Sequence, residues 1–346
     1  MAPKTKAPEQ NTNLSNRDFA DLIIKKTNDE KEGAILRLSD GVIGTEATEF
    51  ISTQAPSLDL AIGKPGIPVG KVTSIVGEEK SGKSTLCQHL IAECQEQGGM
   101  AYLLDSEAAF DTGRASSIGV KLDELNMMGS ETIEEAFTDL RATLDSIIEV
   151  NPPFVSLIIF DSVSSLPTEA ETKKDADESA GVGTHARAIS RGFRGIPKKL
   201  AKARCALVLV SQDRAAITMY GNKKTYIGEG SIKYQTILKI RVQDSGKIFS
   251  PDKKETDPIG IKSHFKCELN KTASPYREAM VDNYFIGGFD SVQSEFDVLC
   301  KLGHIEKAGA WYKYNGSSFH ASDWKEKREE WPELLELVKS GKPNQN

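Results

Sequence analysis

Short apolar runs alternate with longer amphipathic stretches along the central part of the chain. The stretches at 132–148 and 184–203 have apolar residues three and four positions apart, which predicts helices. Around them lie five runs with the composition of buried strands, at 72–76, 101–104, 156–160, 206–211 and 236–242. Uninterrupted apolar strands separated by helices are typical of a parallel sheet that is covered on both faces. We therefore predict the α/β fold class with a mostly parallel sheet.

The amino-terminal segment follows a different pattern. The first 15 residues are polar and contain two prolines, which predicts disorder. Residues 18–26 have a helical pattern that Asn16 would cap, and short β-like runs follow at 34–38 and 50–51. We expect this segment to end near residue 45.

Towards the carboxyl end the pattern changes again. Residues 239–268 are expected to form antiparallel strands with a charged hairpin at 250–255. A smaller mixed segment that contains three tryptophans begins near Asp290. We therefore expect three parts, namely an N-terminal segment, the α/β core and a small α+β C-terminal domain, at 1–45, 46–288 and 289–346.

Composition limits the cellular setting more than the chemistry. None of the apolar runs in the 346 residues approaches the roughly 18 residues of a membrane span, and the N-terminus lacks a hydrophobic signal-peptide core. The five cysteines are scattered, which predicts a reducing, cytoplasmic compartment and no disulfide framework. The net charge of −6 argues weakly against a nucleic-acid partner unless positive residues gather on one surface.

The most informative motif is the glycine-rich stretch at 77–84 (GEEKSGKS), between the strand at 72–76 and a helical pattern. Its glycines let backbone N–H groups cradle phosphate oxygens, while Lys83 would reach the β/γ-phosphates and Ser84 would ligate Mg²⁺. An ordinary turn that matches the pattern by accident is the alternative. The flanking strand and helix favour binding of a nucleoside triphosphate with Mg²⁺. The predicted nucleotide contacts here are Gly77, Glu78, Glu79, Lys80, Ser81, Gly82, Lys83, Ser84 and Thr85.

Polar side chains end three of the other predicted strands. Asp161 ends one strand and would hold Mg²⁺, although an aspartate in this place is often only a helix cap. Asp105 and Glu107 end another strand, where a carboxylate could orient or deprotonate the attacking water. Gln212 ends a third and could sense the γ-phosphate through its amide. Because ligands bind at the carboxyl ends of strands in open α/β sheets, we expect these groups to meet.

A stripe of cations recurs along the predicted helix at 184–203. Apolar residues occupy the opposite face, so a solvated surface above a buried stripe is one interpretation. Five cations without interleaved acids also suit a phosphate backbone. Pro197 would split the stripe by a kink. The cations are Arg187, Arg191, Arg194, Lys198 and Lys202.

A long glycine- and lysine-bearing segment, 213–233, follows Gln212 directly. Such a loop inside a compact domain is usually functional or disordered. Its position suggests that the nucleotide controls its order, as in switch loops.

Taken together, these residues resemble the RecA family of homologous-recombination ATPases from about residue 33 to 320. The matching motifs follow in the family's order: 51–63 (ISTQAPSLDLAIG), 77–85, 105–111 (DSEAAFD), 157–162 (LIIFDS) and Gln212. Residues 305–312 (IEKAGAWY) are particularly specific, because they resemble the family's C-terminal domain and have no role in generic P-loop ATPases.

The resemblance implies a helical filament on single-stranded DNA that pairs with homologous double-stranded DNA and exchanges strands. ATP would lie between subunits, with Glu107 as the catalytic base beside Lys83 and with Gln212 coupling ATP to DNA. Residues 171–183 and 213–230 would be the DNA-binding loops. The DNA contacts that we expect are Arg187, Arg191, Arg194, Arg214, Lys223 and Lys224.

The resemblance also implies contacts between subunits. Lys233 and Tyr234 would reach the neighbouring nucleotide, and the N-terminal helix and strand, as an oligomerisation segment, would pack on the next protomer. Asp111 and Arg114 fall where the family contacts adenine; an aromatic is usual at the second position, but a guanidinium can also stack on a base. Single-strand-binding or loader proteins are further expected partners.

The sequence departs from the bacterial pattern at several positions. Two lysines of the family contact ATP across the interface; Leu269 replaces one here and Lys271 retains the other. Ser106 and Asp213 also differ from the usual residues, and the last 22 residues, 325–346, are charge-balanced rather than acidic. These departures indicate a divergent member, for which a phage origin is one interpretation.

Four functions remain open at this point. The intact pair Lys83 and Glu107 favours a DNA-dependent recombinase ATPase, whereas a mediator that joins such filaments without efficient turnover would fit the loss at Leu269. A ring helicase shares the core but should lack the module at 308–312. A small-molecule kinase explains neither the basic face nor the segment after Gln212.

Overall fold

The computed structural model describes residues 15–31, 47–173, 183–215, 224–225, 228–250 and 256–344. The chain divides into two units, Met1–Thr45 and Glu46–Asn346.

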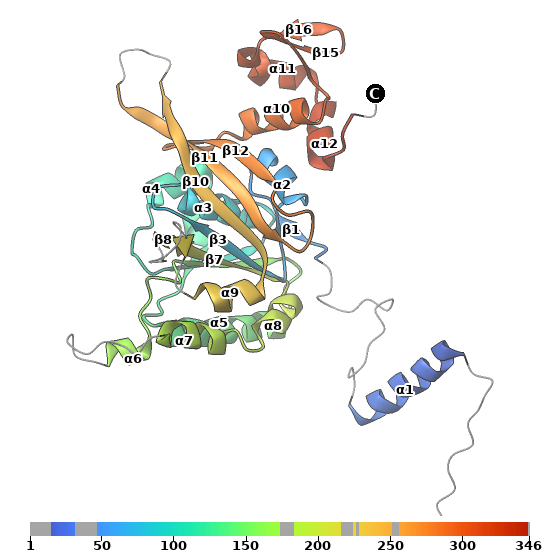
Figure 1. Cartoon of the computed structure of the whole chain (residues 1–346), viewed down its shortest axis with the longest axis vertical. Helices are drawn as coiled ribbons and strands as arrows, with labels where there is room; N and C mark the ends of the chain where they lie inside the picture. Colours follow the sequence, from blue (N-terminus) through green and yellow to red (C-terminus); the bar gives the residue numbers. More distant parts are fainter. Residues whose placement is uncertain are drawn as a thin grey trace, which may run out of the picture. The chain divides into compact units, whose positions relative to one another are not determined.

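A nine-stranded sheet forms the centre of the larger unit, in the order β13-β12-β11-β10-β3-β7-β6-β4-β5 (Figure 1). The strands from β10 to β5 run parallel, and β10 to β13 pair antiparallel. The sheet confirms the predicted α/β class and all five apolar strands. Its strands are β3 (Val72–Gly77), β4 (Met100–Asp105), β5 (Leu125–Met127), β6 (Ser156–Asp161), β7 (Cys205–Gln212), β10 (Thr236–Phe249), β11 (Pro258–Asn270), β12 (Glu278–Tyr284) and β13 (Gly288–Phe289).

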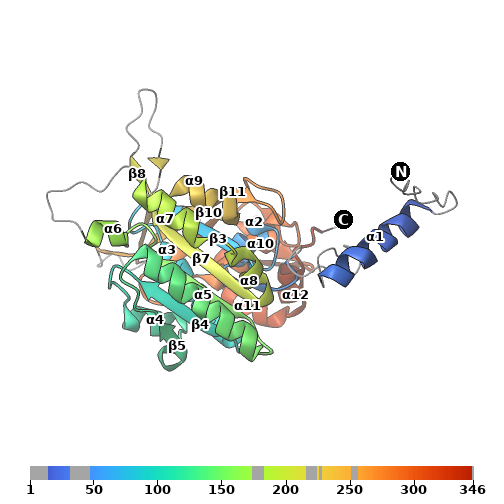
Figure 2. The same ribbon diagram turned by 90° about the horizontal axis from the view of Figure 1, so that it is seen from below.

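Helices cover both faces of this sheet. Figure 2 shows α5, α7, α8 and α9 gathered on one side. The opposite face carries α2 and α3, with α4 beside them and the short pair β1 (Phe50–Ile51) and β2 (Ile67–Pro68). The helices are α2 (Pro56–Ile62), α3 (Lys83–Glu96), α4 (Thr112–Ile118), η2 (Leu122–Glu124), α5 (Ile133–Val150), α6 (Glu169–Thr172), α7 (Thr184–Gly192), α8 (Ile196–Lys202) and α9 (Glu229–Gln235).

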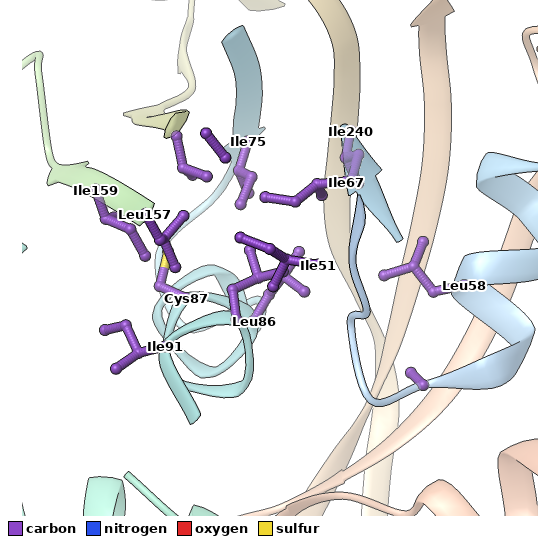
Figure 3. Close-up of a cluster of buried hydrophobic side chains, with 14 of the residues drawn as sticks. Ile51, Leu58, Ile67, Ile75, Leu86, Cys87, Ile91, Leu157, Ile159 and Ile240 are labelled. Atoms are coloured by element: carbon purple, nitrogen blue, oxygen red, sulfur yellow. The ribbon is translucent and has the colours of Figure 1, made fainter. Parts of the chain in front are cut away.

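Two apolar cores lie against the two faces because every central strand is buried on both sides. One packs around α3, where Ile75, Leu86 and Leu157 come together (Figure 3). The other packs under α5, where the rings of Phe137 and Phe193 lie 5.0 Å apart. The sheet is therefore anchored from both faces, and its strand ends occupy fixed positions.

The predicted helix at 184–203 is two helices. α7 ends at Gly192 and α8 begins at Ile196, with Gly195 between them in the left-handed region (φ 80°). Pro197 lies in the first turn of α8, where a missing N–H breaks no helical bond. The expected split of the cationic stripe is thus confirmed, but it is a break between two helices at residues 193–195 and not a kink at Pro197.

The smaller unit contains α1 (Asn16–Glu30), longer than the helix predicted at 18–26. The predicted cap at Asn16 is wrong. Ser15 is the cap, because its hydroxyl accepts from the Asp18 N–H while the Asp18 carboxylate accepts from the Ser15 N–H at 2.8 Å. The predicted disorder at the start of the chain, to residue 14, and the predicted strand at 34–38 lie outside the described residues.

The C-terminal part of the larger unit has an apolar core of its own. Phe296, Phe319, Trp324, Trp331 and Leu334 are buried together there. The division predicted at residue 289 stays a prediction. The elements are α10 (Ser291–Lys301), β14 (Glu306–Ala308), β15 (Trp311–Tyr314), β16 (Ser317–Phe319), η3 (Ala321–Asp323), α11 (Trp324–Glu330) and α12 (Glu333–Ser340).

All five cysteines are free thiols, as predicted. Within the described ranges, none of the helices is long and apolar enough to cross a membrane. The pair β10–β11 confirms the predicted antiparallel strands, and residues 251–255 of the predicted hairpin lie outside the described residues.

Gly192 packs directly on the ring of Phe137, and a Cβ there would lie 2.3 Å from two ring atoms. Phe160 and Phe193 hold the Phe137 ring on other sides, so it cannot move away. We expect Gly192→Ala to lower the free energy of unfolding by about 1–3 kcal/mol, measured by denaturant unfolding.

Gly230→Ala is the matched control. Gly230 lies in α9, and nothing stands within 4 Å of the place that a Cβ would occupy there. The substitution should leave stability unchanged or raise it by about 0.4–1 kcal/mol. Equal effects at the two glycines would contradict the packing account.

Candidate functional site

The glycine-rich loop joins β3 to α3, which confirms the predicted strand, loop and helix. Glycine is required at Gly77 because a Cβ would lie 2.2 Å from the Val242 carbonyl oxygen. Gly82 caps α3 with φ 109°, and a Cβ there would meet the Ser263 hydroxyl at 2.6 Å. The backbone can therefore turn closely around an anion at the start of α3.

Lys83 lies at the first position of α3 and is almost fully buried, with 7% of its surface exposed. Its Nζ donates to the Glu78 carbonyl oxygen at 2.6 Å, and Ser81 donates to the same oxygen at 2.8 Å. Burial lowers the pKa of Lys83, and the nearby carboxylates of Asp161 and Glu107 oppose this shift. The ammonium is thus held inside the loop, where a phosphate would replace the carbonyl as its partner.

Ser84 and Asp161 meet across the site although they are 77 positions apart. The Ser84 hydroxyl donates to the Asp161 carboxylate at 2.9 Å. Burial raises the pKa of Asp161, while the Ser84 hydrogen bond opposes the shift. A hydroxyl beside a carboxylate is an oxygen donor set that suits Mg²⁺, so the residues present fit this ion.

Glu107 and Gln212 are brought together by the parallel order of β4, β6 and β7. The Gln212 amide donates to the Glu107 carboxylate at 2.9 Å, and the Ser162 hydroxyl donates to the same oxygen at 3.1 Å. Two donors therefore fix the direction of a carboxylate at the carboxyl edge of the sheet.

Sequence reasoning missed the serines that hold this carboxylate. The Ser106 hydroxyl donates to the Ser162 carbonyl and accepts from the Ser162 N–H, both at 2.9 Å. Ser162 and Ser165 are 3.0 Å apart through their hydroxyls. The run of serines directly after Asp161 was the available signal, because a hydroxyl there faces the end of the neighbouring strand.

Asp105 holds the loop that carries Glu107 by accepting hydrogen bonds from the backbone of that loop. Its two oxygens accept from the backbone N–H groups of Glu107 at 3.2 Å and Phe110 at 2.8 Å. Beside this loop is a pocket lined by Ser84, Cys87, Gln88, Ile91, Leu103, Asp105, Glu107, Ala109, Phe110 and Asp161.

Asp111 and Arg114 begin α4 on the same side of the sheet. Asp111 caps the helix by accepting from the Arg114 N–H at 2.9 Å. The Arg114 guanidinium donates to Thr85 at 2.8 Å and to Asn283 at 3.2 Å. Arg114 therefore ties the end of the P-loop to β12 in this structure, and base stacking stays a prediction.

The residues expected to contact the nucleotide of a neighbouring subunit lie away from the P-loop of their own subunit. Lys233 is exposed on α9, next to Tyr234, which is 82% exposed. Lys271 is exposed just after β11 and Leu269 is half-buried in that strand. Within the described part of this subunit, no hydrogen bond or ion pair joins Lys233 or Lys271 to the P-loop.

The five cations at 187–202 are all exposed, over the buried residues Ile189, Phe193, Ile196 and Leu200. Among the described residues no ion pair neutralises them. A groove of about 300 Å³ beside α7 is lined by Arg187 and Arg191 and also by Arg141 of α5. Lys223 and the side chains of Arg214 and Lys224 lie outside the described residues; only the backbone pair β8 (Arg214–Ala215) and β9 (Lys224–Thr225) is described.

The comparisons with known proteins agree with this arrangement. The model of the RecA N-terminal domain matches residues 20–290. Protein RecA of Thermus aquaticus is 35% identical over 321 residues, which cover 90% of each chain. Protein RecA of Wolbachia pipientis subsp. Culex pipiens is 34% identical over 313 residues, 90% of this chain and 84% of that protein. The chain belongs to the RecA family of DNA-recombination ATPases.

Proposed function

We propose that this chain hydrolyses ATP with Glu107 as the base and uses Gln212 to couple hydrolysis to single-stranded DNA during homologous pairing and strand exchange. The observation that carries the proposal is the direct hydrogen bond between these two side chains beside the P-loop.

The residues divide the chemistry between them. Backbone N–H groups of the loop and the Lys83 ammonium would hold the phosphates of ATP. Ser84 and Asp161 would hold Mg²⁺, which supplies positive charge where the phosphates become more negative. Glu107, aimed by Gln212 and Ser162, would accept a proton from the attacking water.

Gln212 has a second possible partner in this scheme. Its amide now donates to Glu107, and a γ-phosphate would compete for the same N–H group. A change of partner would move the start of the segment that follows Gln212. In this way the nucleotide could alter the DNA-binding segment at 213–230.

The DNA surface includes the cations of α7. Arg187 and Arg191 on α7, and Arg194 directly after it, are exposed and lie over a buried apolar stripe. Unpaired cations in such a row suit a phosphate backbone. Arg214, Lys223, Lys224 and residues 171–183 complete this proposed surface.

The family membership implies self-association into a filament. Lys233 and Lys271, both exposed, are proposed to reach the neighbouring subunit's ATP. Asp111 and Arg114 are proposed to border the base. Loader or single-strand-binding partners and a cytoplasmic location belong to the same proposal.

The mediator function is not favoured. A protein without efficient turnover has no need of an aligned base, yet Glu107 is oriented by two donors here. The loss at Leu269 removes only one of the two lysines expected to act between subunits.

Glu107→Gln tests the role of the base. The amide oxygen can still accept from Gln212 and Ser162, so the site should keep its shape, but an amide cannot take the proton. Steady-state ATP turnover with single-stranded DNA should fall by about 100-fold or more, while DNA binding with ATP persists. Glu124→Gln, which alters an exposed acid 3.5 Å from Lys121, should have no effect.

A strand-exchange assay between single-stranded DNA and a homologous duplex tests whether the chain is a recombinase. With ATP the wild-type chain should form joint molecules. Undiminished turnover of Glu107→Gln would rule out Glu107 as the base. A wild-type chain that binds single-stranded DNA, but neither turns over ATP efficiently nor forms joint molecules, would favour the mediator.

Arg191→Gln tests the cationic face. Loss of one phosphate contact should weaken binding of single-stranded DNA and lower the slope of log affinity against log salt by about 0.7. Binding titrations at several salt concentrations measure both. Lys339→Gln, an exposed cation in α12, is the control. An unchanged slope for Arg191→Gln would exclude this contact.

A further inference from the structure

A cluster of five charged side chains lies on the α9 side of the sheet, directly beyond Gln212. Arg241 is central, since its guanidinium pairs with Asp213 on one side and with Glu268 on the other. Lys239 continues the cluster, at 3.0 Å from Glu268 and 3.4 Å from Glu229. Arg241 and Lys239 lie in β10. Glu268 lies in β11, Glu229 lies in α9, and Asp213 directly follows β7, so the cluster connects these four elements.

Because they are largely buried, these ion pairs are stronger than ion pairs on the surface. The Asp213 side chain is only 3% exposed and that of Arg241 is 13% exposed. The second Asp213 oxygen has no hydrogen-bond partner among the described residues, so this carboxylate relies on Arg241. Burial raises the pKa of Glu268, but hydrogen bonds from Arg241 and Lys239 more than offset it and leave the pKa below its ordinary value.

One end of the cluster is bonded to the ATP site. Asp213 follows Gln212, whose amide contacts Glu107 at 2.9 Å. The Asp213 N–H also donates to the carbonyl of Gly77, the first residue of the P-loop, at 3.1 Å. A shift of Gln212 would therefore pull on a carboxylate that Arg241 holds.

The other end of the cluster leads to the cationic face. Glu229 is the first residue of α9. Two residues later, the Ser231 hydroxyl donates to the Ala186 carbonyl of α7 at 3.0 Å, next to Arg187. The chain thus leaves the cluster at Asp213 and returns to it at Glu229, beside the helix that carries the exposed arginines.

We propose that Arg241 is a positioning residue that transmits the state of the Glu107–Gln212 pair to α9 and α7, and so links ATP binding to DNA affinity. The inference rests on the proposed function, because it needs DNA on the face of α7. It adds a residue that the sequence analysis did not single out. The alternative is that Arg241 only neutralises the buried Asp213 carboxylate.

The test measures binding coupling, which is the ratio of the single-stranded DNA dissociation constants without nucleotide and with a non-hydrolysable ATP analogue. Arg241→Gln should lower this ratio by about tenfold, a typical size for coupling between two sites. DNA affinity without nucleotide should stay within about twofold, because the cations of α7 remain.

The double variant Asp213→Asn with Arg241→Gln separates coupling from folding. It removes the unpaired buried carboxylate, so its thermal unfolding temperature should recover relative to Arg241→Gln. Its coupling ratio should stay low, because the link to Glu268 is still broken. This variant also serves if Arg241→Gln alone does not fold.

Arg204→Gln is the matched control. Arg204 precedes β7 at its other end, pairs with Glu49 and donates to the Pro153 carbonyl at 3.0 Å. The variant Arg204→Gln should keep the wild-type coupling ratio even if it lowers the stability of the fold.

Two results would overturn the inference. One is a wild-type coupling ratio in Arg241→Gln, and the other is a ratio restored together with stability in the double variant. A wild-type chain that binds no single-stranded DNA would instead contradict the proposed function.

Discussion

The structure depends on the parallel alignment of β3, β7, β6 and β4, which places the ends of four strands at one edge. Gly77 pairs with Gln212 in register, and Asp105 pairs with Asp161. This alignment puts the P-loop, the Ser84–Asp161 pair and the Glu107–Gln212 hydrogen bond next to one another. None of these groups is close to its partner in sequence. Two apolar cores hold the sheet from both faces, so the edge presents a rigid set of side chains to a nucleotide.

The Glu107–Gln212 hydrogen bond gives the site a second property besides catalysis. Gln212, which donates to the proposed base Glu107, is also the last residue of β7, and the chain continues from it into the segment proposed to bind DNA. In the proposed function, a nucleotide that competes for the Gln212 amide would therefore act on both Glu107 and that segment. The ion pairs of Arg241 and Lys239 extend this connection across β10 and β11 to α9, which is bonded to α7 through Ser231.

Much of the sheet and of the P-loop was predictable from the sequence, because the pattern of buried strands and the P-loop motif are local. The strand ends at Asp161, Glu107 and Gln212 followed from the rule that ligands bind at the carboxyl edge. Other features depend on tertiary contacts that no local pattern encodes. The pattern at 236–242 predicted only a strand, whereas the ion pairs of Arg241 and Lys239 with Asp213, Glu268 and Glu229 form between separate elements. Arg114 was expected at a base and is bonded to Thr85 and Asn283, since β12 passes beside α4.

The most direct test of the account is the ratio of steady-state ATP turnover with and without single-stranded DNA in Gln212→Met. Methionine keeps the length of the side chain but cannot donate to Glu107 or to a phosphate. The account predicts that DNA stimulates turnover of the wild-type chain and that the ratio falls to about one in the variant, a loss within the range of site-to-site coupling. Wild-type stimulation in Gln212→Met would contradict the claim that this hydrogen bond connects ATP to DNA.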